Sequence, residues 1–396
     1  MARLVADIKP LRRHRAFRRL WFGQLVSSTG SQLTVVAVSF QAFVLTRSTL
    51  VVGLVSLAQL VPLVLGSIGG GIIADATDRR RITMGCQVLS ATSSGGLVAN
   101  ALVPHPAVWP LFVCTGALAA LQGADQAARR AALPMIVPAE DVTSAVALQT
   151  VMFQCALVVG PALGGLLIAT IGLGSVYGID VASFGASFTA AALLPSLVPS
   201  GGGTPVGFKS LVEGLQYLRR ERLLAGSYWI DLNAMIFGMP RAVFPALGTG
   251  IFGGGAGTVG LLYAAPGAGS LIGSLLTGWV SGVRRRGRAV VFSVAVWGAT
   301  ITLFGFTKVL WGALLLLALA GAADVISAVF RQAILQTTTP EHLQGRLSGT
   351  FFAVVAGGPR LGDLETGAAA AIAGPEFAVW SGGLACLAGI GVVLWR

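Results

Sequence analysis

Three charged side chains lie close together in a stretch that is otherwise apolar. Residues 356–367 read A-G-G-P-R-L-G-D-L-E-T-G, inside an apolar run from Leu347 to Ile372 that is long enough to cross a bilayer as one helix. Charges in such a run are costly, so they are usually paired or face a polar cavity. On a helix, Arg360 and Asp363 share a face while Glu365 points elsewhere. These residues could exchange protons or hold an anion within a membrane.

Glu365 is our first choice for proton exchange, because it has no obvious local partner. An alternative is that it meets Arg241 across the bundle. Asp363 is expected to be neutralised by Arg360. For Asp125 and Asp324, a structural ion pair with Arg129 or Arg331 is at least as well supported as a coupling role. The predicted set for proton coupling is Glu365, Asp363, Asp231 and Asp180.

Polar side chains within other apolar runs are the candidates for substrate contact. A transported molecule would be recognised by shape, by aromatic contact and by a few polar groups. Arg360 could instead hold an anionic substrate. The predicted substrate-binding residues are Gln24, Gln32, Gln41, Gln154, Asn233, Tyr263 and Arg360.

The composition shows what kind of protein must position these residues. Of the 396 residues, 55% are hydrophobic and only 11% are charged, and the mean hydropathy is +0.81. Soluble proteins carry about 25% charged residues. This much apolar surface cannot all be inside a soluble core, so the chain is an integral membrane protein.

Several other classes are excluded by what the sequence contains. The net charge of +12 comes from arginines in short turns between apolar runs, with no basic face for nucleic acid. Four single cysteines and three dispersed histidines form no metal-binding pattern. No phosphate-binding loop of the G-x-x-x-x-G-K-[ST] type and no nucleophile–base set occurs. We therefore expect no metal, no cofactor and no enzymatic activity.

The apolar runs predict an all-α protein with about twelve transmembrane helices in two sets of six. A Gly-rich hinge at 199–205 and an amphipathic helix from Phe208 to Arg222 separate the sets. The expected domains are a six-helix bundle at 1–198, a cytoplasmic linker at 199–223 and a second bundle at 224–396. The predicted spans are Leu20–Leu45, Leu50–Ala74, Ile82–Leu102, Val108–Ala128, Val142–Ile171, Leu173–Leu197, Leu224–Ile251, Thr258–Val283, Ala289–Thr307, Leu310–Val329, Leu347–Ile372 and Phe377–Trp395.

The arginines and lysines fall mainly in alternate turns of this arrangement. They cluster at the N-terminus, after the second span, in the linker and after the eighth span, while the opposite turns hold Arg47 and Lys308. Positively charged turns stay on the cytoplasmic side of a membrane. We therefore expect a multi-pass protein of the cytoplasmic membrane with both termini in the cytoplasm.

The two sets of spans are related to each other. Gly160-Pro161 recurs as Gly358-Pro359, and Gly358 follows Gly160 by 198 residues, half the chain. Asp125 recurs as Asp324, 199 residues later. Two six-span halves related by a parallel repeat are a transporter architecture, with the substrate site expected between the halves near the bilayer midplane.

The loop after the second span carries a family resemblance. Residues 71–81 read G-I-I-A-D-A-T-D-R-R-R, which resembles the G-x-x-x-D-[RK]-x-G-x-[RK]-[RK] signature of the major facilitator superfamily. Ala76 stands in place of the usual base, and Asp78 in place of the usual glycine. The resemblance implies a gate latch in which Asp75 meets the cytoplasmic ends of spans four and eleven, where Arg129 and Arg346 are available.

Other stretches resemble the exporter branch of this superfamily that includes the enterobactin exporter and macrolide-efflux-like proteins. The run G-P-A-L-G-G at 160–165 resembles its span-five motif, and similar stretches cover almost the whole chain. The span-four motif R-x-x-Q-G is only partly present, since Ala119 replaces its arginine. The resemblance implies these gating residues: Gly71, Asp75, Arg79, Arg80, Arg129, Arg346, Gly160, Pro161, Gly358 and Pro359.

The sequence therefore predicts a secondary active transporter that exports a small amphipathic molecule, drug-like or siderophore-like, by proton antiport and alternating access. Its expected partners are the substrate, protons and the lipid bilayer, and we expect a monomer. One alternative is an importer or facilitator of a small metabolite on the same fold. Another is a non-transporting membrane sensor or scaffold, which predicts no effect on drug or siderophore levels.

Overall fold

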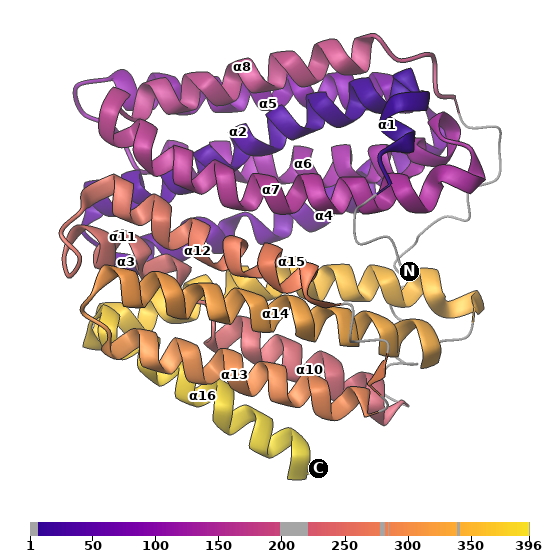
Figure 1. The fold of residues 1–396 in the computed structure, drawn as a ribbon. Coiled ribbons are helices and arrows are strands. Elements are labelled where there is room, and N and C mark those ends of the chain that lie inside the picture. The colour runs from indigo at the N-terminus through magenta and orange to yellow at the C-terminus, as the bar shows by residue number, and fades with distance from the viewer. Residues whose placement is uncertain (1–6, 199–220, 278–281, 284, 339–340, 396) are drawn as a thin grey trace. The chain divides into compact units, whose positions relative to one another are not determined.

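The computed structural model describes residues 7–198, 221–277, 282–283, 285–338 and 341–395, with side chains left undescribed at 222–223, 341–356 and 394–395. Within these ranges all regular structure is helical (Figure 1). The predicted amphipathic helix from Phe208 to Arg222 lies outside the described residues, apart from its last two residues, Glu221 and Arg222. The predicted domain limits at 198, 199–223 and 224 stay a prediction.

The helices of the N-terminal half follow the six predicted spans. They are α1 (Lys9–Arg13), α2 (Arg15–Thr46), α3 (Thr49–Ala58), α4 (Leu60–Ala76), α5 (Arg79–Leu102), α6 (Trp109–Ile136), α7 (Ala139–Ile171) and α8 (Leu173–Ala192). The C-terminal half repeats the pattern with α10 (Arg222–Phe237), the short helices η1 (Arg241–Val243) and α11 (Phe244–Thr249), α12 (Gly255–Leu275), α13 (Arg286–Phe306), α14 (Leu310–Thr338), α15 (Glu341–Ala373) and α16 (Pro375–Trp395). The prediction of an all-α protein with six passes in each half is confirmed.

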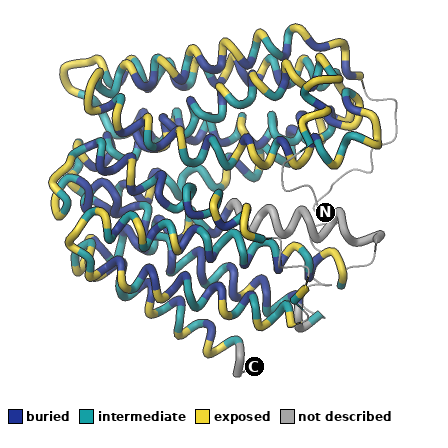
Figure 2. Tube along the Cα trace, in the orientation of Figure 1, coloured by how far each residue is buried: buried dark blue, intermediate teal, exposed yellow. Residues whose placement is uncertain are grey.

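Seven of the described helices are long and apolar enough to cross a membrane by length and composition alone: α2, α3–α4, α7, α12, α13, α14 and α16. The remaining passes are shorter or more polar; α15, for example, contains Arg360, Asp363 and Glu365. Exposed residues occur along many helices (Figure 2). Large apolar side chains such as Phe292 and Trp311 are among them. Such a surface suits lipid rather than water.

Two predicted spans are interrupted, and proline explains both interruptions. The span predicted at Leu50–Ala74 is divided into α3 and α4 at Gln59, three residues before Pro62. A proline donates no backbone N–H and clashes with the preceding turn, so a helix breaks just before it. In the same way α10 ends at Phe237, and the chain restarts as η1 after Pro240.

Single glycines make the tight turns between the fifth and sixth passes of each half. Gly172 joins α7 to α8 with φ of 83°, and Gly374 joins α15 to α16 with φ of 94°. Residues other than glycine rarely adopt this left-handed region. Each glycine lets two long helices follow each other directly in an antiparallel hairpin.

The two halves also repeat their helix packing. The main helix pairs of the first half are α4 with α6, α5 with α8, and α5 with α6; those of the second half are α12 with α14, α13 with α16, and α13 with α14. Close approach depends on glycine: a Cβ on Gly123 would overlap the backbone of Leu63, and one on Gly321, 198 residues later, would overlap Pro266. Small residues at helix crossings are the usual packing device in lipid.

The contacts divide the chain into two compact units. Unit 1 comprises Met1–Gln41 and Ala58–Pro205, and unit 2 comprises Ala42–Leu57 and Val206–Arg396. Unit 2 thus includes the C-terminal end of α2 and all of α3 except Ala58. The division at residues 57 and 58 lies next to the break in the helix at Gln59.

Candidate functional site

In unit 2, the buried Asp363 lies at the centre of a charged cluster. Its Oδ2 accepts a hydrogen bond of 2.5 Å from the Ser56 hydroxyl of α3, and its Oδ1 lies 3.9 Å from Nε of Arg241. Arg360, one helical turn before it on α15, interacts electrostatically with both Asp363 and Arg241. We call Arg241, Arg360 and Asp363 the arginine cluster; its charges sum to one net positive charge.

The interruption between α10 and α11 places Arg241 in this cluster. Trp297 of α13 donates to the carbonyl of Gly238 at 2.8 Å, and the hydroxyl of Tyr263 donates to the carbonyl of Arg241 at 3.0 Å. These bonds hold the non-helical backbone on both sides of Pro240. The predicted substrate contact Tyr263 therefore bonds to the backbone of the residue that faces Asp363.

Glu365 lies apart from the ion pairs of unit 2 that the structure describes. It is half-buried, and its Oε2 lies 3.3 Å from the Thr366 hydroxyl. The predicted alternative that Glu365 meets Arg241 is not what the structure shows, since Arg241 faces Asp363. From the sequence spacing, Arg360 is the only expected partner of Asp363. In the structure Asp363 also lies next to Arg241.

Two further acids of unit 2 share an arginine. Arg331 of α14 forms a buried salt bridge with Asp231 of α10, and its guanidinium also lies 3.7 Å from Asp324. Asn233, two residues after Asp231, donates to the carbonyl of Cys386 on α16 at 2.8 Å. Asp231 and Asn233 thus join α10 to α14 and α16.

In unit 1, Asp180 of α8 is fully buried and is surrounded by hydroxyl groups. Thr34 of α2 and Ser94 of α5 each donate to its Oδ2 at 2.7 Å, and Ser183 lies 3.3 Å from its Oδ1. One turn before it on α8, the Tyr177 hydroxyl donates to Gln41 at 2.8 Å. Gln41, predicted as a substrate contact, is 2% exposed and occupied by this bond.

The other buried acid of unit 1 is paired within its own helix. Arg129 donates to Asp125 at 2.7 Å and to the Ser187 hydroxyl at 2.9 Å, and Gln87 donates to Asp125 at 3.0 Å. This network ties α5, α6 and α8 together. The predicted latch between Arg129 and Asp75 is not formed here, because Arg129 is engaged with Asp125 and Asp75 is exposed.

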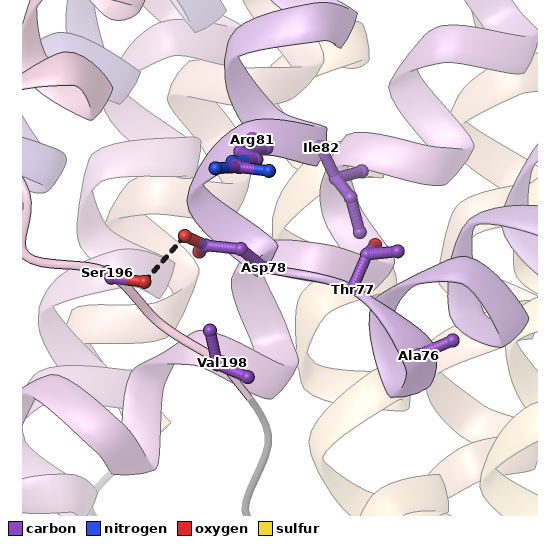
Figure 3. Close-up of a pocket in the computed structure, with 7 residues that line it drawn as sticks. All are labelled: Ala76, Thr77, Asp78, Arg81, Ile82, Ser196 and Val198. Carbon is purple, nitrogen blue, oxygen red and sulfur yellow. Dashed lines mark hydrogen bonds between the residues drawn. The ribbon is translucent and has the colours of Figure 1, made fainter.

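Asp78 organises the loop between α4 and α5. It caps α5 by accepting from the Arg80 amide at 3.0 Å, and it accepts from the Leu197 amide at 2.9 Å and from the Ser196 hydroxyl at 2.7 Å (Figure 3). Burial alone would raise the pKa of Asp78, but these hydrogen bonds and the nearby Arg81 charge hold its pKa below the ordinary value. The carboxylate stays ionised as a helix cap.

The neighbouring arginines extend this loop network. Arg79 donates to the Ala131 carbonyl of α6 at 3.0 Å, and Arg80 donates to the Ala192 carbonyl at the end of α8 at 2.6 Å. A shallow cavity of about 560 Å³ opens beside them and is lined by Ala76, Thr77, Asp78, Arg81, Ile82, Ser196 and Val198 (Figure 3). The loop therefore fixes the ends of three helices of unit 1.

The remaining predicted residues have the following environments. Gly160 packs against Gln32 and Thr29 of α2, and Gly358 packs against Met235 of α10, so both Gly-Pro pairs lie at helix contacts.

Oε1 of Gln24 is buried and accepts no hydrogen bond from the described residues. Gly71 and Gln154 are half-buried, and the side chain of Arg346 lies outside the described part of the chain. Pro161 and Pro359 lie inside α7 and α15.

Sequence reasoning missed the hydroxyl partners. Thr34, Ser94 and Ser56 are ordinary residues of transmembrane helices, and nothing in their spacing indicates that they meet a carboxylate from another helix. Arg241 was noticed only as a partner for Glu365. Among the described residues, no group of three or more His, Cys, Asp and Glu side chains could hold a metal ion.

Twelve helical passes in two related halves, with charged and hydroxyl groups buried among them, define a secondary transporter of the major facilitator type. The solved structures agree. A variant of the nucleoside transporter NupG matches 96% of this chain and 98% of its own with a TM-score of 0.77 at 11% identity. A bacterial homologue of the human lysosomal transporter Spinster matches 98% and 95% with a TM-score of 0.72 at 13% identity.

The sequence comparisons identify the family within this fold. Residues 5–395 match the family described as transmembrane secretion effectors, and the chain belongs to this family of the major facilitator superfamily. It is 30% identical over 391 residues to the enterobactin exporter EntS of Shigella boydii, covering 98% of this chain and 93% of the relative. The EntS protein of Escherichia coli O1:K1 matches equally well. The protein is thus a multi-pass membrane transporter of a small molecule and not an enzyme.

Proposed function

We propose that the protein exports a small siderophore-like molecule across the cytoplasmic membrane by proton antiport, acting as a monomer with both termini in the cytoplasm. The observation that carries this proposal is the similarity to the enterobactin exporter, which extends over 98% of the chain. The orientation rests on the arginine-rich turns. Proton antiport is proposed because a facilitator transporter moving its substrate against a gradient needs an ion gradient.

The arginine cluster supports an acidic, oxygen-rich substrate. Arg241 and Arg360 bring two guanidinium groups near one carboxylate within unit 2. Guanidinium groups bind paired, negatively charged oxygen atoms well, which suits an acidic substrate. Tyr263, whose hydroxyl donates to the backbone carbonyl of Arg241, would add a polar contact within the same unit.

We further propose that the α4–α5 loop and the Gly-Pro helices are the gating elements of an alternating-access cycle. Asp78, Arg79 and Arg80 hold the ends of α5, α6 and α8 together, which makes one end of unit 1 move as a block. Pro161 and Pro359 allow α7 and α15 to bend. A latch from Asp75 to Arg129 or Arg346 belongs to a different state of the same cycle.

The test measures enterobactin in cells that synthesise it but lack their own exporter. Expression of this protein should move enterobactin from the cells to the medium, and a proton uncoupler should abolish the effect. An Arg241→Gln variant should export at least about tenfold more slowly, since a lost charged contact is worth about 1.5–3 kcal/mol. Arg47→Gln, which changes an exposed arginine in the α2–α3 turn, is the control and should export normally.

Other outcomes would contradict the proposal in different ways. Increased retention or uptake of enterobactin by the expressing cells would reject export and favour an importer. An unchanged distribution of both enterobactin and a panel of amphipathic drugs would favour a non-transporting role.

A further inference from the structure

The aspartates inside the helix bundles are held in two different ways. Asp125, Asp231, Asp324 and Asp363 each lie within 4.0 Å of an arginine nitrogen. Asp180 has no ion pair among the described residues, and the groups that contact its carboxylate are the hydroxyls of Thr34, Ser94 and Ser183. These hydroxyls come from α2, α5 and α8, and we call them the hydroxyl cage.

The charged groups on the helices around Asp180 lie far along their axes. On α2 the arginines end at Arg19, 15 residues before Thr34, and on α5 they end at Arg81, 13 residues before Ser94. At 1.5 Å per residue, both separations are about 20 Å. Glu140 and Asp141 of α7 lie at the start of that helix. Arg129 of α6 is closer: it bonds to Ser187, which is about 10 Å from Asp180 along α8.

Two uncharged titratable groups complete these surroundings. Tyr177 lies one turn from Asp180 on α8 and interacts electrostatically with it, and the thiol of Cys114 on α6 interacts with Tyr177. The immediate surroundings of Asp180 are therefore neutral and rich in hydroxyls.

A hydroxyl cage accepts either protonation state of a carboxyl group. A hydroxyl has one donor and two acceptor positions and can rotate, so it donates to a carboxylate and accepts from a carboxylic acid. Protonating an acid that is paired with a buried arginine, by contrast, leaves an unpaired charge in the interior, which is costly. A group that must gain and lose a proton in each cycle is better placed in the cage than in an ion pair.

Buried polar groups continue on both sides of Asp180 along one face of α8. Tyr177, Asp180, Ser183 and Ser187 follow one another at three- or four-residue spacing, and all four are at most 5% exposed. Tyr177 bonds to Gln41 at one end, and Ser187 accepts from Arg129 at the other. This polar stripe extends for about 15 Å along α8 inside unit 1 and places polar groups on both sides of Asp180.

We propose that Asp180, within its hydroxyl cage, is the group that binds and releases the coupling proton. Its carboxylate takes up one proton from the outer side, becomes a neutral carboxylic acid, and releases the same proton to the inner side. The coupling role rests on the proposed antiport, whereas proton binding by Asp180 does not. Glu365, our first choice from the sequence, becomes the competing hypothesis.

The first test detects the proton without any substrate. The purified protein in lipid vesicles is titrated with acid and base while infrared difference spectra record the carbonyl stretch of protonated carboxyl groups. The wild type should show a buried carboxylic acid band that disappears as the pH rises. The band should be missing in Asp180→Asn and retained in Glu365→Gln. A band that survives in Asp180→Asn, or is lost in Glu365→Gln, overturns the proposal.

A second, less disruptive variant keeps the proposal testable if Asp180→Asn fails to fold. Ser94→Ala removes one of the two hydroxyls that donate to Oδ2 and leaves the carboxyl group in place. It should shift the midpoint of the band in the pH titration relative to the wild type. An unchanged midpoint would show that the band arises from another acid and would overturn the proposal.

The second test separates coupling from transport. Vesicles loaded with enterobactin are given an imposed pH gradient. Asp180→Asn should move enterobactin down its concentration gradient but lose the acceleration that the pH gradient gives the wild type. If the wild type moves no enterobactin at all, the proposed substrate fails while the infrared result still decides the proton site. A normal response of Asp180→Asn to the pH gradient rejects Asp180 as the coupling group.

Discussion

Unit 1 and unit 2 are built on the same helix pattern, but their most deeply buried acids have different partners. In unit 2, Asp231, Asp324 and Asp363 all face arginines. In unit 1, Asp180 is held by hydroxyls. It is the eighth residue after the turn glycine Gly172, and the eighth residue after the corresponding glycine Gly374 is Gly382. The repeat therefore preserves the packing of the helices and the arginine-paired acids Asp125 and Asp324, whereas Asp180 has no acidic counterpart.

This difference favours a division of roles between the units. Ion pairs between buried groups resist any change of charge, because each partner would be left unpaired. Such ion pairs suit a region whose charge stays constant during the cycle, for example a region that binds an acidic substrate. A neutral cage suits a group whose charge changes in each cycle.

The largest expected effect comes from breaking an arginine pair of unit 2. Arg331→Gln leaves Asp231 as a buried charge without its salt bridge, which should lower the free energy of unfolding by about 3–5 kcal/mol. Thermal unfolding in detergent, followed by circular dichroism, measures the loss. The double variant Asp231→Asn with Arg331→Gln should recover much of it. A single variant as stable as the wild type would show that this pair is not what holds α10 to α14.

The shared packing predicts equal effects in both units. Gly123→Ala and Gly321→Ala each place a methyl group against the backbone of a neighbouring helix, and overpacking of this kind costs about 1–3 kcal/mol. Gly257→Ala on α12 is the control, since a Cβ there meets nothing within 4 Å. Unequal losses at Gly123 and Gly321 would mean that the repeat preserves the fold but not its packing energy.

Much of this fold could be predicted from the sequence, and little of the site. Apolar runs, alternating basic turns and the Gly-Pro repeat indicated twelve passes, because span length and charge bias are local properties of the chain. The partners of the buried acids could not be predicted, because they come from other helices. The hydroxyl of Ser94 lies 86 residues from Asp180, and that of Ser56 lies 307 residues from Asp363. Serine and threonine also occur in many spans without any such role.

Equivalent serines in the two units give a more direct comparison. Ser94 of α5 donates to Asp180, whereas Ser293, 199 residues later on α13, is buried without a hydrogen bond to an acid among the described residues. Ser94→Ala should lower the free energy of unfolding by about 1–2 kcal/mol, as expected for a lost hydrogen bond to a charged or acidic group. Ser293→Ala should change it by less than about 0.5 kcal/mol. Equal effects on the unfolding midpoint would remove the distinction between the cage and its counterpart.

The smallest effect is expected at the loops that follow the second pass of each unit. Asp78 caps α5 and holds residues 196–197, while the corresponding loop at 276–288 contains no acid. Asp78→Ala should cost about 1 kcal/mol, the usual value of an N-cap, and the same change at Thr77, which only bonds within its own helix, is the control.

The pH dependence of this loss follows from the lowered pKa of Asp78. A carboxyl group whose pKa is lower in the folded state contributes its full stability above its ordinary pKa of about 4 and loses it as the pH falls further. The difference between wild type and Asp78→Ala should therefore stay constant from neutral pH to about pH 5 and shrink below about pH 4. Unfolding midpoints of the wild type and of Asp78→Ala, measured across this pH range, test the prediction. A difference that instead grows on acidification would mean that the loop is held by the arginines and not by the Asp78 carboxylate.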